Sequence, residues 1–165
     1  ASRPLASNLN WVAGATVANR VIVPVGTNGQ IAIYNAQGRA NVVIDVTGYF
    51  TAGASAPAGA SLYTPLSPVR VLDTRKTGHA LGPHATMNQQ MAGVNGIPAT
   101  ATAVVTNVTV VGTTANSYLT VYPGEGRPVV SDVNWGAGET VPNLTVASLG
   151  PTGAISLYNS AGSTN

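Results

Sequence analysis

The chain has 165 residues, of which only 7% are charged, whereas an ordinary soluble domain has about 25%. Thr, Ser, Asn, Gln and Gly must therefore cover its surface, a composition common in exported repeat proteins and unusual for a cytosolic enzyme. Scattered cations with a net charge of +2 give no patch for nucleic acid, and the absence of cysteine excludes disulfide bonds, thiol catalysis and Cys-based zinc sites.

Residues 1–41 are repeated by residues 125–165, without a gap, at a spacing of 124 residues. Of the 41 aligned pairs 17 are identical, among them Asn10-Trp11 with Asn134-Trp135. A gapless match of this length indicates a tandem array, so we expect the sequence to hold about one and a third periods. Residues 1–4 do not resemble a signal peptide, so we expect any export signal to lie outside this sequence.

A period-two alternation of apolar residues predicts strands along the chain, and no stretch carries a helical stripe with caps. The alternation covers residues 31–33, 42–46, 104–110, 119–121 and 155–157. Turn signals lie at 26–29, 95–96, 124–126 and 150–153. This pattern predicts an all-β fold, either an antiparallel β-sandwich or a jelly-roll-like repeat module. A strand-end Tyr followed by Asp ten or eleven residues later occurs three times, which leaves a pseudo-threefold trefoil or prism-like fold as the alternative.

The sequence predicts three parts. Residues 1–50 are the C-terminal part of one repeat, residues 51–61 are an Ala/Gly/Ser/Pro linker, and residues 62–165 are most of the next repeat. The second repeat has no counterpart of Val42–Phe50, the strand that ends the first. We therefore expect an open sheet edge, which residues 42–50 of the same chain or of a neighbouring chain would complete. The assembly residues of this hypothesis are Val42, Ile44, Val46, Tyr49 and Phe50.

The order of motifs along the chain resembles a repeat module of secreted, multidomain actinobacterial proteins. The motifs are Leu72-Asp73-Thr74-Arg75, Tyr118-Leu119-Thr120-Val121-Tyr122-Pro123, Val141-Pro142-Asn143, Leu157-Tyr158-Asn159 and Ile44-Asp45-Val46-Thr47-Gly48-Tyr49. The resemblance covers nearly the whole chain. It implies an exported accessory module, found in tandem or beside hydrolase domains, and it carries over no catalytic residue.

Aromatic residues at recurring positions are the candidates for glycan contact, because an exposed ring stacks on the apolar face of a sugar. They are Trp11, Trp135, Tyr34, Tyr122 and Tyr158. The opposing interpretation is that each Trp closes the end of a core and each Tyr is a repeated core residue with a bonded hydroxyl.

The titratable residues favour a structural role over chemistry. Asp45, Asp73 and Asp132 lie on strands or strand ends, and Asn8 replaces Asp132 in the other copy. An Asn in that place cannot act as a general acid or base, so we expect ion pairs with arginines such as Arg70 and Arg75 or bonds to the backbone. The only histidines, His79 and His84, lie in a loop without a third metal ligand nearby. No catalytic, metal-binding or cofactor-binding residue is predicted.

These observations predict a non-catalytic, extracellular tandem-repeat module with a structural or adhesive role in a stalk, fibre or surface layer. Its expected partners are neighbouring repeats or chains. The alternative is a carbohydrate-binding module that anchors a secreted enzyme to polysaccharide or to the cell wall. No apolar run approaches the roughly 20 residues that span a bilayer, so no membrane partner is expected.

Overall fold

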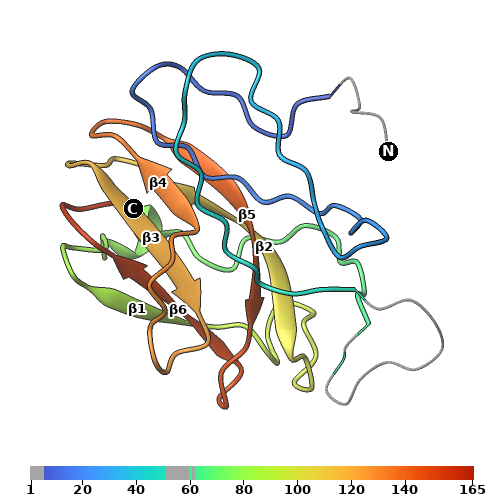
Figure 1. Cartoon of the computed structure of the whole chain (residues 1–165). Coiled ribbons are helices and arrows are strands. Elements are labelled where there is room, and N and C mark those ends of the chain that lie inside the picture. Colours follow the sequence, from blue (N-terminus) through green and yellow to red (C-terminus); the bar gives the residue numbers. More distant parts are fainter. Residues whose placement is uncertain (1–5, 51–59, 61) are drawn as a thin grey trace.

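The computed structural model describes residues 6–50, 60 and 62–165, and its strands form two antiparallel sheets (Figure 1). The elements in chain order are α1 (Thr74–Thr77), β1 (Thr86–Gln90), β2 (Ala103–Val110), β3 (Ser117–Tyr122), β4 (Val133–Trp135), β5 (Val141–Ser148) and β6 (Ala154–Asn159). The all-β class and the antiparallel sandwich are therefore confirmed. The described strands form open sheets and no barrel, so the trefoil alternative is wrong.

The larger sheet has the order β1-β6-β3-β4 and the smaller sheet consists of β2 and β5 alone. β2 and β5 are aligned over eight residues, from Ala103 opposite Ser148 to Val110 opposite Val141. In the larger sheet β3 lies in the interior, because it pairs with β6 on one side and with β4 on the other. The smaller sheet has only two strands, so β2 and β5 each have one edge without a neighbouring strand.

One hydrophobic core fills the space between the two sheets. In β2 every second residue from Val104 to Val110 is buried or half-buried and the others are exposed, as expected for a strand with one face on a core. Val133 at the start of β4 is fully buried. The buried apolar residues that join both sheets in this cluster include Val104, Val110, Leu119, Val121, Val133, Trp135, Ala147, Ile155 and Leu157. Inside the sandwich, the hydroxyl oxygens of Thr106 and Thr145 bond each other at 2.7 Å.

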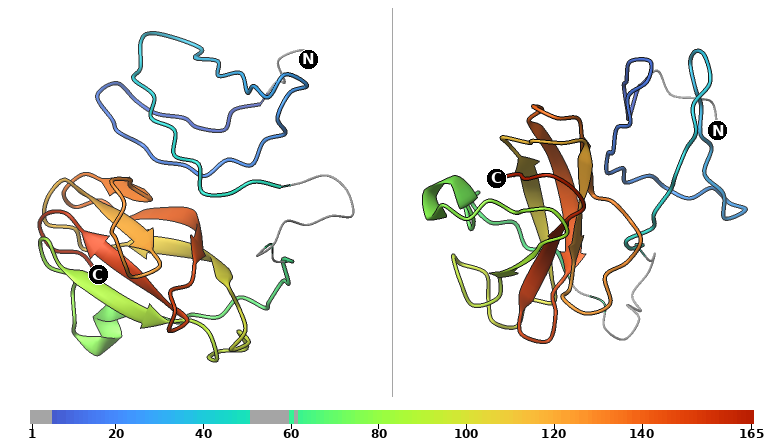
Figure 2. Two further views of the ribbon diagram at one scale, coloured as in Figure 1. Left: turned by 60° about the horizontal axis from the view of Figure 1, so that its bottom comes forward. Right: turned by 90° about the vertical axis from the view of Figure 1, so that its left-hand side faces the viewer.

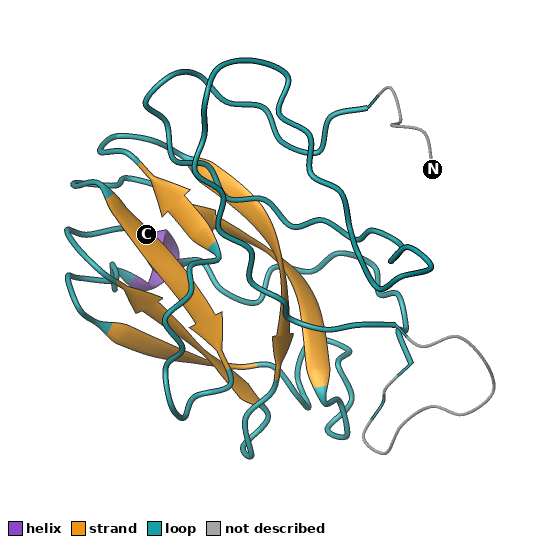
Figure 3. Cartoon of the chain, in the orientation of Figure 1, coloured by secondary structure: helices purple, strands orange, loops and turns teal. Residues whose placement is uncertain are grey.

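Residues 6–50 form a layer of loops beside the sandwich and contain no strand (Figures 2 and 3). The strands predicted at 31–33 and 42–46 are thus not formed. The physical reason is pairing: the segment equivalent to residues 30–35 is β6, which is a strand because β1 and β3 bond to its two edges. Without a ladder partner the same alternation leaves its apolar side chains in solvent.

The loops of residues 6–41 nevertheless keep the local bonding of residues 125–165. The Gly29 N–H bonds the Gly26 carbonyl at 2.9 Å, and the Gly153 N–H bonds the Gly150 carbonyl at 2.8 Å, 124 residues later. Gly29 and Gly153 share a φ of +77°, a left-handed conformation that favours glycine in this turn. The turn is therefore formed in both copies, although only the second has strands on its two sides.

A second bonding pattern recurs at the same spacing. The Asn10 side-chain amide donates to the Ser7 hydroxyl at 3.1 Å, and the Asn134 amide donates to the Ser131 hydroxyl at 3.0 Å. Two further bonds, Asn19 Nδ2 to the Asn8 carbonyl and Asn143 Nδ2 to the Asp132 carbonyl, are also equivalent. The two copies thus share short-range contacts and differ in their long-range ones.

Candidate functional site

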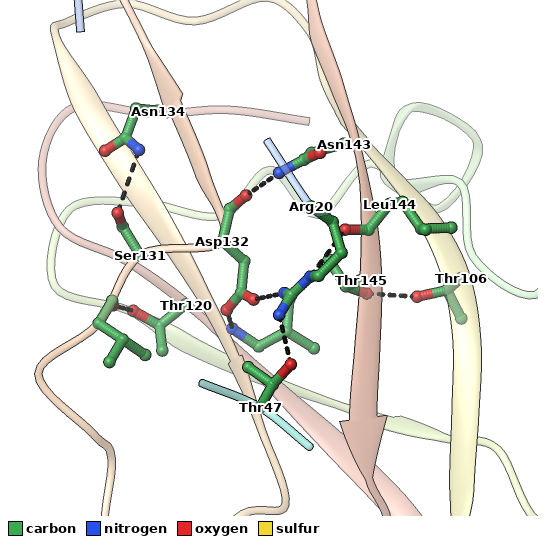
Figure 4. Close-up of polar contacts among 12 residues, drawn as sticks. Arg20, Thr47, Thr106, Thr120, Ser131, Asp132, Asn134, Asn143, Leu144 and Thr145 are labelled. Carbon is green, nitrogen blue, oxygen red and sulfur yellow. Dashed lines mark hydrogen bonds and ion pairs between the residues drawn. The ribbon is translucent and has the colours of Figure 1, made fainter. Parts of the chain in front are cut away.

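Arg20 makes three bonds, two to residues of the sandwich and one within the N-terminal loops (Figure 4). One terminal nitrogen lies 2.5 Å from the Asp132 carboxylate, and the other donates to the Thr47 hydroxyl at 2.7 Å. The Arg20 Nε–H donates to the Leu144 carbonyl on β5 at 3.4 Å. The guanidinium therefore links Thr47, in the N-terminal loops, to Asp132 and Leu144 in the sandwich.

Asp132 is a buried, fully bonded carboxylate at the entry to β4. One oxygen pairs with Arg20, and the other accepts the Val121 N–H at 2.8 Å. Its own carbonyl accepts the buried Asn143 amide at 2.6 Å. The ion pair and the backbone bond expected for Asp132 are thus both formed, and a carboxylate bonded in this way holds a loop in place.

Both charged partners stand at positions where the two copies differ in charge. Leu144 occupies the position equivalent to Arg20, and Asn8 the position equivalent to Asp132. We expect Arg20→Leu to destabilise the fold by about 1–3 kcal/mol, because it leaves a mostly buried carboxylate without its cation. Asp132→Asn still accepts the Val121 N–H, so its cost should be about 1–2 kcal/mol.

The double variant tests whether the two residues act through each other. Its loss of unfolding free energy, measured in urea, should fall short of the summed single losses by about 1 kcal/mol, within the range for residues in contact. Additive losses would mean that Arg20 and Asp132 do not pair in solution.

Asp73, in the Leu-Asp-Thr-Arg motif, is held by two arginines. Arg75 donates two parallel bonds of 2.8 Å to its carboxylate, and Arg70 donates a third at 3.1 Å. The ion pairs expected for Asp73 are thereby confirmed. The Arg75 bonds, reinforced by Arg70, hold the pKa of the Asp73 carboxyl far below its usual range. Asp73 directly precedes α1, but its carboxylate bonds the arginines and does not cap the helix, which ends at Gly78 in the left-handed conformation.

Acid should therefore remove a part of the stability that depends on Asp73. A carboxyl whose pKa is lower in the folded than in the unfolded state stabilises the fold above its unfolded pKa of about 3.9. That contribution is lost as the pH falls below about 4 towards the depressed folded pKa. The free energy of unfolding, followed by denaturation from pH 6 to pH 2, should fall less steeply in Asp73→Asn than in the natural chain. Parallel curves would contradict this account.

The aromatic candidates for glycan contact are divided between core and solvent. Trp135 is only 5% exposed and Tyr122 is also buried, so neither offers a ring face to a sugar, and their assignment as glycan contacts is wrong. Trp135, on β4, is packed in the core between the sheets. Tyr122, on β3, pairs with Ser156 and lies on the face opposite core-facing Val121. Trp11, the equivalent of Trp135, is 44% exposed, and Tyr34, the equivalent of Tyr158, is also exposed.

Tyr158 lies on the outer face of the larger sheet and is half-buried. The Arg127 guanidinium sits 4.1 Å from the centre of its ring, and the Tyr118 ring lies 6.4 Å away. His84 Nδ1 is 3.3 Å from its hydroxyl. These contacts make Tyr158 part of a small surface cluster in which a cation already covers its ring.

The remaining candidates for chemistry do not converge. His79 and Asp45 are exposed, and no three His, Cys, Asp or Glu side chains gather to hold a metal within the described part of the chain. The side chains of the assembly hypothesis, Val42, Ile44, Val46, Tyr49 and Phe50, are all exposed. Completion of the sandwich by residues 42–50 of the same chain is thus not what this structure adopts.

Sequence reasoning missed Arg20 and Thr47 as contact residues. A signal was present, since Arg20 replaces an apolar residue of the other copy just where Asp132 replaces an amide. Within the described residues no helix is long and apolar enough to cross a membrane. Comparison of the chain with protein-family models, with curated proteins and with solved structures found no match.

Proposed function

We propose that this chain is a non-catalytic, extracellular module of a tandem array that builds a stalk, fibre or surface layer. Its modules join by strand exchange through Val42–Phe50. The low charge, the 124-residue repeat and the resemblance to modules of secreted actinobacterial proteins support this role. The chemistry of the joint is hydrophobic burial combined with main-chain hydrogen bonds.

The observation that carries the proposal is the contrast between the two copies. Both have the same turns and side-chain bonds, yet Trp135 is 5% exposed and Trp11 is 44% exposed. Residues 6–50 therefore keep local contacts of the second copy without its strands, and their apolar row remains in solvent. The large exposed apolar residues between positions 42 and 50 are Val42, Val43, Ile44, Val46, Tyr49 and Phe50. An exposed apolar row of this extent is typical of an interaction surface.

The exposed rings of Trp11 and Tyr34 are the main support for the carbohydrate-binding alternative. Their equivalents, Trp135 and Tyr158, are covered by strands or by Arg127. We therefore attribute the exposure of Trp11 to the absence of strands in residues 6–50 rather than to a sugar platform. A glycan array probed with the natural chain separates the two functions, because only the alternative predicts binding to a sugar. A sugar that binds should also quench the Trp fluorescence of the chain in solution.

Light scattering behind size exclusion, across a dilution series, tests the proposed assembly. We expect the mass to grow with concentration in steps of one chain. A mass of 16.6 kDa at every concentration would contradict assembly by strand exchange.

A further inference from the structure

The smaller sheet has two edges, and the direction of its backbone groups shows what each edge offers. Thr102 and Leu149 continue the pairing of β2 with β5, and the Leu149 N–H donates to the Thr102 carbonyl at 2.8 Å. Because bonded pairs alternate along an antiparallel ladder, the even-numbered residues of β2 point their backbone groups towards β5. The odd-numbered residues therefore point to the opposite edge. These residues are Ala103, Val105, Asn107 and Thr109, and among the described residues no second strand lies along the edge to which their backbone groups point.

The edge of β5 is closed by two features. Pro142 lies opposite Thr109, so its backbone also points away from β2, and proline has no N–H to offer to a further strand. The next outward carbonyl, that of Leu144, already accepts the Arg20 Nε–H. The edge of β2 contains no proline over residues 103–110. Strand addition is therefore directed to β2.

The end of β2 shows where such a strand begins. Val111 and Asn165 exchange two backbone bonds, of 2.8 and 2.9 Å, which places them directly opposite each other in antiparallel geometry. A strand continuing from the position of Asn165 would run along the open edge of β2. In the first copy the equivalent of Asn165 is Asn41, and Val42–Phe50 follow it directly.

This anchor gives the register of an added strand: Asn165 keeps the place opposite Val111, and the donor joins the edge at Val42, with its Asn41 outside the ladder. Counting back from Val111, Val42 lies opposite Val110, Ile44 opposite Val108 and Val46 opposite Thr106. These β2 residues form its inward, buried or half-buried face. The three apolar donor residues thus enter the core side, where an added strand must be apolar.

The intervening residues complete the match on the other side of the strand. Asp45 lies opposite Asn107 and Thr47 opposite Val105, on the outer face, which is exposed at both β2 positions. The alternation of residues 42–47 therefore agrees with the alternation of β2 at each step. A shift by one residue would direct Asp45 and Thr47 into the core.

We propose that the open edge of β2 binds residues 42–50 of a second copy of this chain, antiparallel, with Asp45 opposite Asn107. This inference rests on the proposed function and names its acceptor and register. The backbone of Ala103, Val105, Asn107 and Thr109 supplies the ladder, and Val42, Ile44 and Val46 extend the core.

Engineered cysteines test this register, since the natural chain has none. Asp45→Cys chains are mixed with Asn107→Cys chains under mild oxidation. Directly opposite residues in a bonded antiparallel pair have Cα atoms about 5.5 Å apart, within the range that a disulfide bridges. The matched controls pair Asp45→Cys with Val105→Cys or Thr109→Cys, whose diagonal separations of about 7–8 Å are too long.

Mass spectrometry of the cross-linked peptides should find the 45–107 link at least tenfold above either control. Equal yields at the three acceptor positions would overturn both the register and the choice of the β2 edge as acceptor. If the mass still grew with concentration in that case, the proposed function would stand. A double variant with both cysteines in one chain provides the second comparison. A 45–107 link that forms only within single chains would overturn the second copy as donor, and the proposed assembly with it.

Discussion

Replacing Trp135 by alanine will lower the free energy of unfolding by about 3–5 kcal/mol, whereas the same change at Trp11 will lower it by less than about 1 kcal/mol. The two residues are equivalent in the repeat, but only Trp135 is packed in the core between the sheets. Truncating a buried indole removes all its contacts and leaves a cavity, whereas truncating a half-exposed one in a loop removes fewer contacts and leaves no enclosed cavity. Urea denaturation at low protein concentration, followed by circular dichroism, measures both losses.

Trp135→Phe provides the intermediate comparison if the alanine variant is too unstable to fold. It should lose less than Trp135→Ala and more than Trp11→Ala. Equal losses at positions 11 and 135 would mean that residues 6–50 are packed as tightly as the sandwich, contrary to their exposure.

Replacing Ile44 by aspartate will abolish the concentration-dependent growth in mass, while Val43→Asp will preserve it. Ile44 belongs to the donor face that enters the core, where its burial contributes about 1.5–3 kcal/mol and where a carboxylate adds a desolvation penalty. At 1.4 kcal/mol for each tenfold, the loss of burial alone weakens association by at least about tenfold. Val43 lies on the outer face beside Asp45, which already carries a charge.

Both variants are compared in the same dilution series by light scattering. Because residues 42–50 are exposed and unpaired with the sandwich in the single chain, neither substitution should change its unfolding free energy by more than about 0.5 kcal/mol. Equal effects of Ile44→Asp and Val43→Asp on assembly would contradict the assigned faces.

The sequence was sufficient to predict the strands that carry apolar alternation and also have partners. β2, β3 and β6 fall where the alternation places them. β1 was missed because its sequence, Thr-Met-Asn-Gln-Gln, is mostly polar, and it is a strand only because β6 offers an edge. Residues 31–33 show the converse, since they alternate correctly and form no strand. The local sequence pattern determines where a turn forms and which side chains share a face. Whether the segment becomes a hydrogen-bonded strand depends on partners that are distant in the sequence.

The candidate interface was harder to predict for the same reason. Arg20 and Asp132 are 112 residues apart, and no local pattern brings them together. Their complementary departures from the repeat were visible, but an ion pair can be inferred from them only once the loops are known to lie beside β5. The buried Trp135 and the exposed Trp11 likewise have the same local sequence, and their different environments follow from long-range contacts alone.

Amide exchange along β2 tests most directly that its open edge receives a strand. Hydrogen–deuterium exchange, carried out in dilute and concentrated samples, quenched and then measured by NMR, resolves successive amides. We expect the amides of Val105, Asn107 and Thr109 to exchange fast when dilute and to become protected on concentration. The alternate amides, which bond to β5, should be protected throughout. Outward amides that exchange equally fast at every concentration would contradict strand addition at this edge.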